Sequence, residues 1–454
     1  MRNVIVIVGA GFSGTVLAVN LLRRPCAMPT DIVLVERGPA MNRGVAYAER
    51  DIPYCLNVPA GRLSADSTDP QQFLRFARAR IPEADAEDFL PRSLYGDYLE
   101  DLLHTAEREA TAQVRLLRVH DEVQDLIAAG ARIEARFAQR EPLRADKVIL
   151  AVGNPPASSL PWLRTLRGHR AVRENPWELT RDLHPHHAVL IVGNGLTMAD
   201  VVLNLSSDPA RVPMMHTISR HGLLPQVQTV FQSGSVCGKP EDLLAKADSI
   251  RALLKASREM ARKVKADGGD WREVVTFIRN IAPKIWQKLP LEEQARFVRH
   301  LQTHWDTHRH RLPPQVAERL TQVRTSGKLK VNAGRVQRVE TLPDRLRVFW
   351  LPRGERQPSS FDVDLIVNAT GPDYVLARSS EPLLQSLQTK DLIASDALSL
   401  GISTDGAGAC LNARGEPSAN LFYLGPMLRA DHWEATAATE LRDHAERLAV
   451  RLSA

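Results

Sequence analysis

Residues 4–24 read VIVIVGAGFSGTVLAVNLLRR, and this stretch decides the fold. Residues 4–8 are all β-branched, as a strand buried on both faces of a parallel sheet requires. Three glycines in the spacing G-x-G-x-x-G follow at once, and a helical pattern follows the glycines. Strand, glycine turn and helix in this order predict a dinucleotide-binding unit.

Each glycine of this turn has its own expected role. Gly9 permits the tight turn, Gly11 lets the backbone approach a pyrophosphate, and Gly14 lets the helix pack closely on the strand. The helix N-terminus directs free N–H groups at the phosphates. Glu36 ends the next expected strand, DIVLVE, where an acid accepts hydrogen bonds from ribose hydroxyls. The first unit is therefore suited to FAD or NAD rather than NADP.

A second unit opens at residues 189–193, VLIVG, and continues through Gly193-Asn194-Gly195-Leu196-Thr197-Met198. Met198 stands where the third glycine would be, so the helix must pack differently. The next strand ends in Ser219-Arg220 and has no acid at the position of Glu36. A Ser-Arg pair there suits a 2′-phosphate and predicts NADPH, with NADH as the alternative. The competing interpretation is that Arg220 is a solvated loop residue.

The same series of strands follows both units. Residues 114–126, 131–137 and 146–154 alternate or run apolar in short segments, and residues 329–340, 345–351 and 364–372 repeat that order. Each series ends in a small-residue turn, at 151–154 and at 369–372. We therefore predict an α/β protein with two Rossmann-like dinucleotide-binding domains and an α-helical insertion. The expected division is 1–160 with 335–454, 185–235 with part of 328–372, and the insertion 238–327.

Composition excludes several other classes of protein. The chain has 454 residues, 44% hydrophobic and 25% charged, which excludes a small module and a disordered chain. Its four cysteines are too few and too scattered for a disulfide framework or a zinc site, so we expect a reduced, cytoplasmic protein. We expect no signal peptide, no membrane span and, without Lys/Arg runs interleaved with aromatics, no nucleic-acid binding.

Several longer motifs resemble those of a known group of proteins. They are VGAGFSGT, GVAYAERDIPYCLNVPAGRLSADSTDPQQFL, VGNGLTMADV with SRHGLLP, HWDTHRHRLPP, VNATGP, and LGPMLRADHWEATAATELR. Together they resemble two-dinucleotide-binding flavoproteins, namely the flavin-containing and N-hydroxylating monooxygenases, and more closely a bacterial family of FAD/NAD(P)-binding proteins. The likeness covers nearly the whole chain but implies no particular substrate.

The resemblance also implies site residues. Asn57 matches an Asn that lies beside the reactive edge of the flavin, and is our expected catalytic residue; an ordinary turn before Pro59 is the alternative. The N-hydroxylating pattern D-x3-[LF]-A-T-G-Y fits at Asp364 and 369–371, but Asn368 and Pro372 depart from it. Where many flavoproteins have Gly-Asp this chain has Gly425-Pro426, so the contact that the Asp makes must come from elsewhere, for which backbone amides are candidates. We expect the C-terminal helix to start at about Trp433 and to present its N-terminus to the flavin.

The full set of expected cofactor-binding residues comes from both units and the C-terminal segment. It consists of Gly9, Gly11, Phe12, Ser13, Gly14, Glu36, Arg37, Asn57, Val123, Ala151, Gly153, Gly193, Gly195, Leu196, Thr197, Ser219, Arg220, Thr370, Gly371, Gly425, Trp433 and Thr436.

The expected insertion is basic and helical. Residues 239–330 hold 20 Lys and Arg against 11 Asp and Glu, more than the whole chain's net charge of +6. Apolar spacing predicts one helix over 241–266, a second that Asp270 caps and that stops before Pro283, and a third from Pro290. The block could act as a lid over the cleft or as an oligomer surface.

The sequence HWDTHRHR (304–311) carries the candidate substrate residues of the insertion. His308, Arg309 and Arg311 could contact an anionic substrate or phosphate, or cap a helix end. His304 and His308 stand at i, i+4, but no second ligand cluster accompanies them, so we expect no metal.

These observations predict an FAD-dependent, NAD(P)H-oxidising enzyme. The resemblance implies a monooxygenase in which a hydroperoxyflavin transfers one oxygen atom from O2 to a small substrate. The first alternative is a reductase without oxygen insertion. This chain differs from the large disulfide reductases, because only a short segment follows Pro426 and no CxxC motif is present. The second is a flavin-binding redox sensor. The sequence is also compatible with a homo-oligomer.

Overall fold

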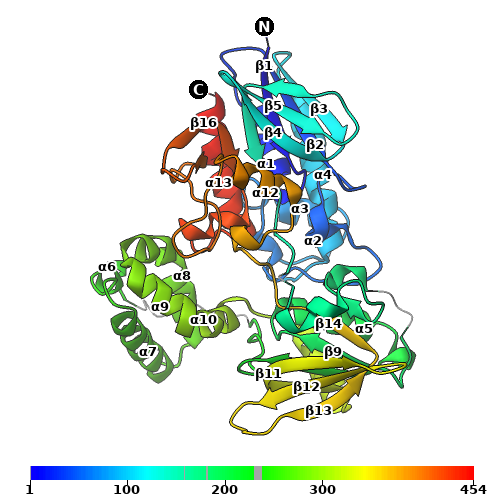
Figure 1. Cartoon of the computed structure of the whole chain (residues 1–454). Helices are drawn as coiled ribbons and strands as arrows, with labels where there is room; N and C mark the ends of the chain where they lie inside the picture. Colours follow the sequence, from blue (N-terminus) through cyan, green and yellow to red (C-terminus); the bar gives the residue numbers. More distant parts are fainter. Residues whose placement is uncertain (1, 158, 180–182, 230–237, 454) are drawn as a thin grey trace.

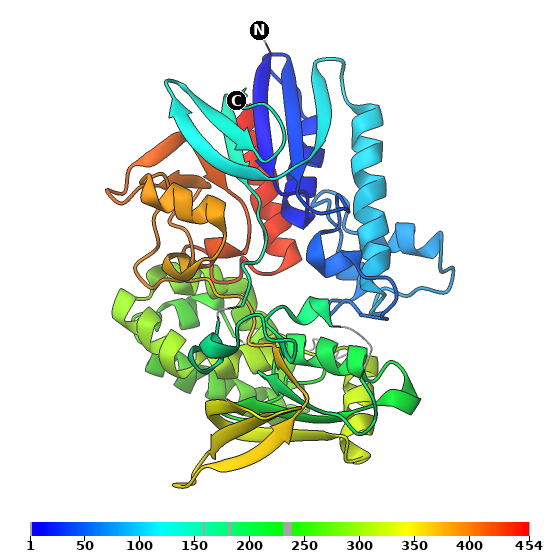
Figure 2. The same ribbon diagram turned by 45° about the vertical axis from the view of Figure 1, so that its right-hand side comes forward.

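The computed structural model describes residues 2–157, 159–179, 183–229 and 238–453. Two sheets form separate units, and a block of helices stands beside them (Figure 1). Both chain termini lie at the outer end of the first unit (Figure 2). Both sheets have parallel strands at their centre with helices against them, so the predicted α/β class with two Rossmann-like units is confirmed.

The first sheet has the strand order β15-β16-β7-β1-β2-β3. Its strands are β1 (Asn3–Val8), β2 (Thr30–Glu36), β3 (Val114–His120), β7 (Lys147–Leu150), β15 (Ala409–Leu411) and β16 (Pro417–Tyr423). All neighbours pair in parallel except β15 with β16. Ile5 and Ile7 face one apolar core and Val6 and Val8 face another, so β1 is buried on both sides, as its composition predicted.

Helices cover one face of the first sheet, and a small sheet with one helix covers the other. The first face carries α1 (Phe12–Leu22), α2 (Gly44–Ala48), α3 (Gln72–Arg78), α4 (Arg92–Glu109) and α13 (Ala438–Ser453). The second carries β4 (Val123–Ala129), β5 (Arg132–Phe137), β6 (Leu143–Ala145) and α12 (Pro382–Thr389).

The second sheet has the order β13-β12-β11-β10-β9-β14-β8. Its strands are β8 (Val172–Arg173), β9 (Ala188–Val192), β10 (Met214–Ser219), β11 (Leu329–Thr341), β12 (Leu346–Pro352), β13 (Ser359–Val363) and β14 (Leu365–Asn368), with α5 (Leu196–Leu205) and α11 (Pro314–Thr325) packed on one face. The expected strands of both series are present. The sequence-based division placed residues 335–368 partly in the first unit; the structure corrects this, because β11–β13 form an antiparallel meander that continues the second sheet.

The two units repeat the same hydrogen bonds. Val4 N–H donates to the Asp146 carboxylate and Ala188 N–H to the Asp364 carboxylate, at 2.8 and 2.7 Å. In turn, Asp146 and Asp364 donate their backbone N–H groups to the carbonyls of Val4 and Ala188. A repeated side-chain contact of this kind supports the duplication that the strand order suggested.

The insertion is a bundle of α6 (Pro240–Leu244), α7 (Ile250–Ala266), α8 (Trp271–Lys288), α9 (Leu291–His300) and α10 (Gln302–Arg309). Asp270 caps α8 in a capping box with Glu273, as predicted. The single helix expected over 241–266 is wrong, because Ser249 caps a new helix whose first-turn Ala252 N–H bonds its hydroxyl. The stop before Pro283 is also wrong, since Ile281, Ile285 and Trp286 stay on the buried face and outweigh the bond that proline removes.

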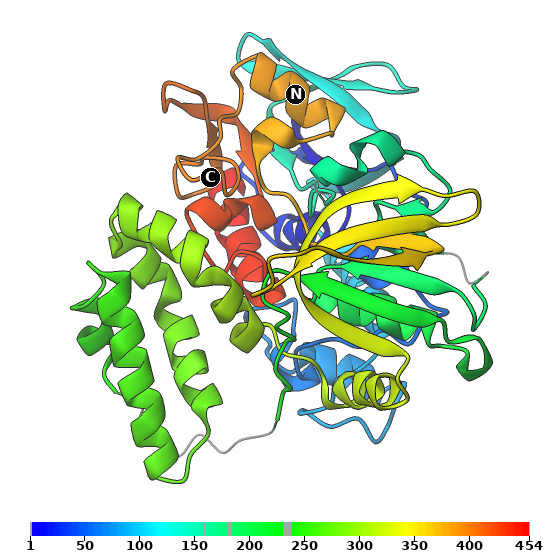
Figure 3. The ribbon, with the colours of Figure 1, turned by 60° about the horizontal axis from the view of Figure 1, so that its bottom comes forward.

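The insertion packs on the C-terminal part of the first unit (Figure 3). Trp286 lies 4.6 Å from the ring of Trp433, centroid to centroid, and its indole N–H donates to the Ala430 carbonyl at 2.8 Å. Among the described residues, every helix is too short or too polar to cross a membrane.

Candidate active site

The first glycine turn has the backbone geometry that phosphate binding requires. Gly9 has φ +105°, and a Cβ there would lie 2.3 Å from the Ala151 carbonyl oxygen. A Cβ on Gly14 would lie 1.9 Å from the Gly9 carbonyl oxygen, so the helix can pack this closely only with glycine. Gly11 precedes Phe12 and Ser13 at the start of α1, where no side chain caps the helix. The first-turn N–H groups are therefore left for an anion, and the residues present fit a dinucleotide such as FAD.

Glu36 closes the same turn from the end of β2. Its carboxylate accepts the Ala10 N–H at 2.9 Å and the Gly38 N–H at 2.8 Å, and it retains lone pairs for ribose hydroxyls. Arg37, in contrast, is already engaged: its guanidinium donates to Glu381 and Glu122, and the Glu381 hydrogen bond raises its pKa. The charge of Arg37 is thus paired with carboxylates of its own chain.

The second glycine turn repeats the first. Gly193 has φ +110°, and a Cβ there would lie 2.4 Å from the Ala369 carbonyl oxygen. Gly195 begins α5 without a side-chain cap, ahead of Leu196 and Thr197, and a Cβ on it would meet nothing within 4 Å. That open side is where a pyrophosphate would approach. Met198 is fully buried in the core of the second unit, which explains how α5 packs without a third glycine.

A basic group surrounds the end of β10. Ser219 pairs in register with Ala333, whose carbonyl accepts the Arg353 N–H at 2.8 Å. Arg220, Arg335 and Arg353 are all exposed here, and within the described ranges none of them has an acidic partner at salt-bridge distance. Burial, then the charges of Arg353 and Arg220, lower the pKa of the adjacent His221. The sequence predicted Arg220 but not Arg335 and Arg353, because only the pairing of β10, β11 and β12 in the sheet brings these arginines close to it.

Residues at the carboxyl ends of the central strands line the corresponding edge of each sheet. Ala151 and Gly153 follow β7, and Thr370 and Gly371 follow β14. Gly153 and Gly371 both have positive φ, +73° and +84°, with open space where a Cβ would be. Val123, at the start of β4, is buried. Ligands in open α/β sheets bind beyond these strand ends.

Asn57 lies in a bend that faces outward. Its side chain is exposed, and among the described residues no group is recorded as its hydrogen-bond partner. The amide is therefore free to meet a ligand.

The segment after β16 differs from the expectation in two respects. The Met427 N–H bonds the Tyr423 hydroxyl and the Leu428 N–H bonds the Gly425 carbonyl, so these amides are not free to replace the missing Asp. The C-terminal helix begins at Ala438, not at Trp433; Trp433 is buried against the insertion, and Thr436 lies in the turns before the helix. Gly425 is extended, and a Cβ there would lie 2.7 Å from the Tyr423 hydroxyl.

Charged side chains join the insertion to this segment. Arg309 donates to Glu434 at 2.9 Å, and both side chains are almost fully buried, with 13% and 4% exposed. Arg279 on α8 bonds Glu440 at the start of α13. The acid that sequence analysis expected near Arg309 is thus Glu434 of the same chain.

The histidines of this region have separate partners. His308 packs its ring on Trp271, and His304 lies against His221. Burial, then the charges of Arg309 and Arg429, lower the pKa of His310 to about 3, so this imidazole stays neutral at ordinary pH. No three metal-ligating side chains gather anywhere in the described part of the chain.

An ion pair that sequence reasoning missed connects the two units. Arg92 at the start of α4 donates to both oxygens of Asp200 on α5, at 2.8 and 3.1 Å, and its Nε donates to the Cys55 carbonyl. The only sequence signal was an aspartate on the otherwise apolar ADVV stretch of α5. The pair holds the helix that follows the second glycine turn.

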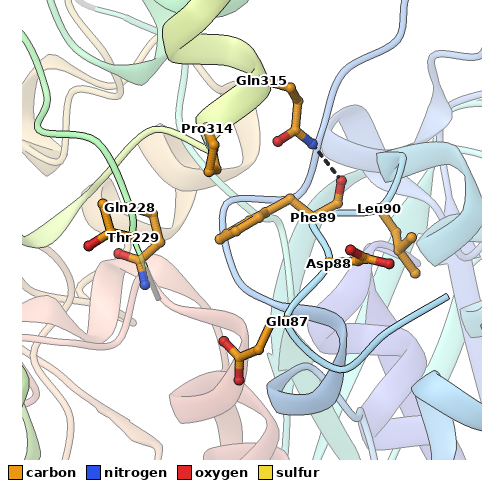
Figure 4. Close-up of a pocket in the computed structure, with 8 residues that line it drawn as sticks. All are labelled: Glu87, Asp88, Phe89, Leu90, Gln228, Thr229, Pro314 and Gln315. Atoms are coloured by element: carbon orange, nitrogen blue, oxygen red, sulfur yellow. Dashed lines mark hydrogen bonds between the residues drawn. The ribbon is translucent and has the colours of Figure 1, made fainter. Parts of the chain in front are cut away.

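Two cavities lie away from the glycine turns. One, of about 300 Å³, is lined by residues 87–90, 228–229 and 314–315; there the Gln315 amide donates to the Phe89 carbonyl at 2.9 Å (Figure 4). The other, of about 790 Å³, runs along α11 beside Cys55 and Asp51. None of the residues expected to bind a cofactor lines either cavity.

The chain thus has the fold of the two-dinucleotide-binding flavoproteins. Residues 6–155 match the protein family described as FAD-NAD(P)-binding. No curated protein matches the sequence. Among solved structures, the chain is similar to the L-lysine 6-monooxygenase of Pseudomonas syringae, with 17% identity, a TM-score of 0.64, and 100% of this chain and 99% of that one covered.

Two further solved structures cover the whole of this chain. The ornithine N-hydroxylase of Kutzneria sp. 744, with reduced FAD, NADP⁺ and L-ornithine, shares 17% identity at a TM-score of 0.59, with 99% of its own chain covered. The bacillithiol disulfide reductase of Staphylococcus aureus shares 12% identity at a TM-score of 0.55, with 98% of its chain covered. At these identities the likeness concerns the fold.

Proposed function

We propose that the protein is an FAD- and NADPH-dependent oxidoreductase that acts as a monooxygenase on a small substrate. The observation that carries this proposal is the pair of duplicated glycine turns, one closed by Glu36 and the other followed by Arg220 with two further unpaired arginines. An acid suits the unphosphorylated ribose of FAD, and a basic group suits the 2′-phosphate of NADPH. Residues 1–160 and the C-terminal segment would hold FAD, and the sheet of residues 172–368 would hold NADPH.

FAD, when bound, supplies the hydride acceptor and the oxygen chemistry; the protein supplies binding, orientation and a dry site. Gly9, Gly11 and the start of α1 would hold its pyrophosphate, and Glu36 its ribose. Gly195 and the start of α5 would hold the pyrophosphate of NADPH. Asn57 would position a ligand at the reactive edge with its free amide.

The insertion favours the lid interpretation over the oligomer surface. Its apolar core includes Trp433 and Leu400 of the first unit, and the Arg309–Glu434 pair reaches the segment after β16. From this position the insertion would shield the carboxyl edge of the first sheet, where excluding water protects the reaction.

Flavin kinetics test this proposal. The protein reconstituted with FAD is mixed with NADPH or NADH without oxygen, and bleaching of the flavin is followed by stopped flow. We expect bleaching by NADPH, faster than by NADH. Oxygen is then admitted with L-ornithine, L-lysine or cadaverine, and hydroxylated product is compared with H2O2. A flavin that neither nicotinamide bleaches would contradict the oxidoreductase and indicate a redox sensor.

A reductase is the second candidate, because the bacillithiol disulfide reductase shares the fold. In that case NADPH would bleach the flavin, but re-oxidation by oxygen would give H2O2 with every substrate, while an added disulfide would accept the electrons. We also propose a cytoplasmic location, consistent with the free thiols of Cys26, Cys55 and Cys410.

A further inference from the structure

Arg311 lies where the insertion meets the first unit. It directly follows α10, two residues after Arg309, whose guanidinium bonds Glu434. Glu434 belongs to the segment that leaves β16 at Gly425, and β16 runs parallel to β7 and β1 with their carboxyl ends aligned. Arg311 therefore lies close to the contact between the insertion and the segment that follows the carboxyl end of β16.

The other arginines around Arg311 lie near acidic partners, whereas Arg311 forms no ion pair with any described residue. Five arginines gather here: Arg272, Arg279, Arg309, Arg311 and Arg429. Arg309 pairs with Glu434 at 2.9 Å, Arg279 with Glu440, and Arg429 approaches Asp306 at 3.9 Å. In the described part of the chain, Arg311 has no carboxylate at salt-bridge distance and no hydrogen-bond acceptor.

The nearest remaining acid does not neutralise Arg311. Asp270 bonds the neighbouring Arg272 at 2.8 Å in a pair of its own. His310 is neutral, since its pKa is about 3, and it adds no positive charge of its own. The group thus has one positive charge in excess.

The unpaired guanidinium is also partly withdrawn from water. Its Nη1 atom has neither solvent nor an acceptor, and burial, followed by the charges of Arg272 and Arg309, lowers its pKa to about 10. A buried donor without a partner costs free energy, and an unpaired buried charge costs more. An anion at this position would remove both costs.

We propose that Arg311 binds a carboxylate of the substrate, so that the substrate of this enzyme is a carboxylic acid. A guanidinium binds the two oxygens of a carboxylate through parallel N–H donors, and one carboxylate neutralises one excess charge. A phosphate dianion would leave a negative charge among Glu434, Glu440 and Asp306. The inference rests on the proposed function, because it takes the edge under the lid to be the substrate site.

Binding to the oxidised, FAD-loaded protein tests the inference without any turnover. The probes are two pairs that differ by one carboxylate: L-lysine against cadaverine, and succinamate against succinamide. Binding is read from the flavin difference spectrum and from the thermal midpoint. We expect at least one acid to bind tenfold or more tighter than its neutral or decarboxylated partner. If neither acid is preferred, the inference is overturned.

Variants assign the preference to Arg311. Arg311→Gln should abolish it, Arg311→Lys should retain part of it, and Arg258→Gln, at an exposed position on α7, should leave it unchanged. The thermal midpoint without probes shows that each variant is folded. Undiminished acid binding in Arg311→Gln would refute the inference.

One other anion has the same chemistry, namely the reduced flavin ring. If Arg311→Gln keeps the acid preference but shifts the flavin midpoint potential to more negative values, the ligand is the flavin and the substrate assignment fails. Because the binding test uses no NADPH, failure of the proposed function would appear separately, as a flavin that NADPH does not bleach.

Discussion

Breaking the ion pair between Arg92 and Asp200 should destabilise the protein strongly. The guanidinium meets both carboxylate oxygens, at 2.8 and 3.1 Å, and the two side chains are only 16% and 11% exposed. In Arg92→Leu the carboxylate of Asp200 would stay buried without its partner. Loss of one member of a buried pair costs ~3–5 kcal/mol of unfolding free energy.

The chain offers a matched control on its surface. Arg347 on β12 makes the same two-pronged contact with Asp362 on β13, at 2.7 and 3.0 Å, but the side chains are 42% and 31% exposed. Solvent screens such a pair, so Arg347→Leu should lower the unfolding free energy far less than Arg92→Leu does. The two variants remove the same side chain and differ in burial.

Urea denaturation followed by far-UV circular dichroism measures both effects. Asp200→Asn and the double variant with Arg92→Leu complete a double-mutant cycle, which isolates the pair's coupling energy. Because α5 follows the second glycine turn, Arg92→Leu should also raise the KM for NADPH. Equal losses in Arg92→Leu and Arg347→Leu would refute the claim that burial makes the first pair matter.

Three further variants test other parts of the site. Gly193→Ala should lower the unfolding free energy by about 2 kcal/mol, because Gly193 has a positive φ and its Cβ would lie 2.4 Å from the Ala369 carbonyl oxygen. Gly195→Ala, which has open space at Cβ, should keep the stability of the protein and weaken NADPH binding. Equal urea midpoints for the two variants would contradict this expectation. Arg220→Ala should reduce the preference for NADPH over NADH in kcat/KM about tenfold or more, the loss of one charge-assisted hydrogen bond, and an unchanged ratio would sink the 2′-phosphate assignment. His310 has a pKa of about 3 in the folded protein and 6.5 in the unfolded chain, so the unfolded chain binds the extra proton and stability falls as the pH drops from about 6.5 towards 3. His310→Asn should flatten this dependence of the unfolding free energy on pH, measured by urea titrations. An identical dependence in the variant would contradict the burial of a neutral imidazole.

Local sequence patterns correctly predicted the buried strand and the glycine turns. The apolar run before Gly9 required a strand buried on both faces, and the strand lies between two cores. The glycine spacing required close backbone approaches, and a Cβ at Gly9, Gly14 or Gly193 would collide with a carbonyl. These features were readable because their cause lies within a few residues of backbone geometry.

Helix boundaries were less predictable where tertiary packing overrides local preference. Pro283 should end a helix on local grounds, yet α8 continues because Ile285 and Trp286 gain burial against the first unit. The start of the C-terminal helix was misplaced by five residues, because Trp433 is held by the insertion instead of by a helical turn.

By itself, then, the sequence determined two glycine turns, their order along the chain and the basic excess of the insertion. Only the tertiary structure decided which charges remain unsatisfied. Arg309 and Arg311 are equivalent in the sequence, but Glu434, 125 residues away, neutralises one and leaves the other. Spacing encodes backbone geometry locally, whereas the pairing of buried charges depends on distances between segments that only the packed chain brings together.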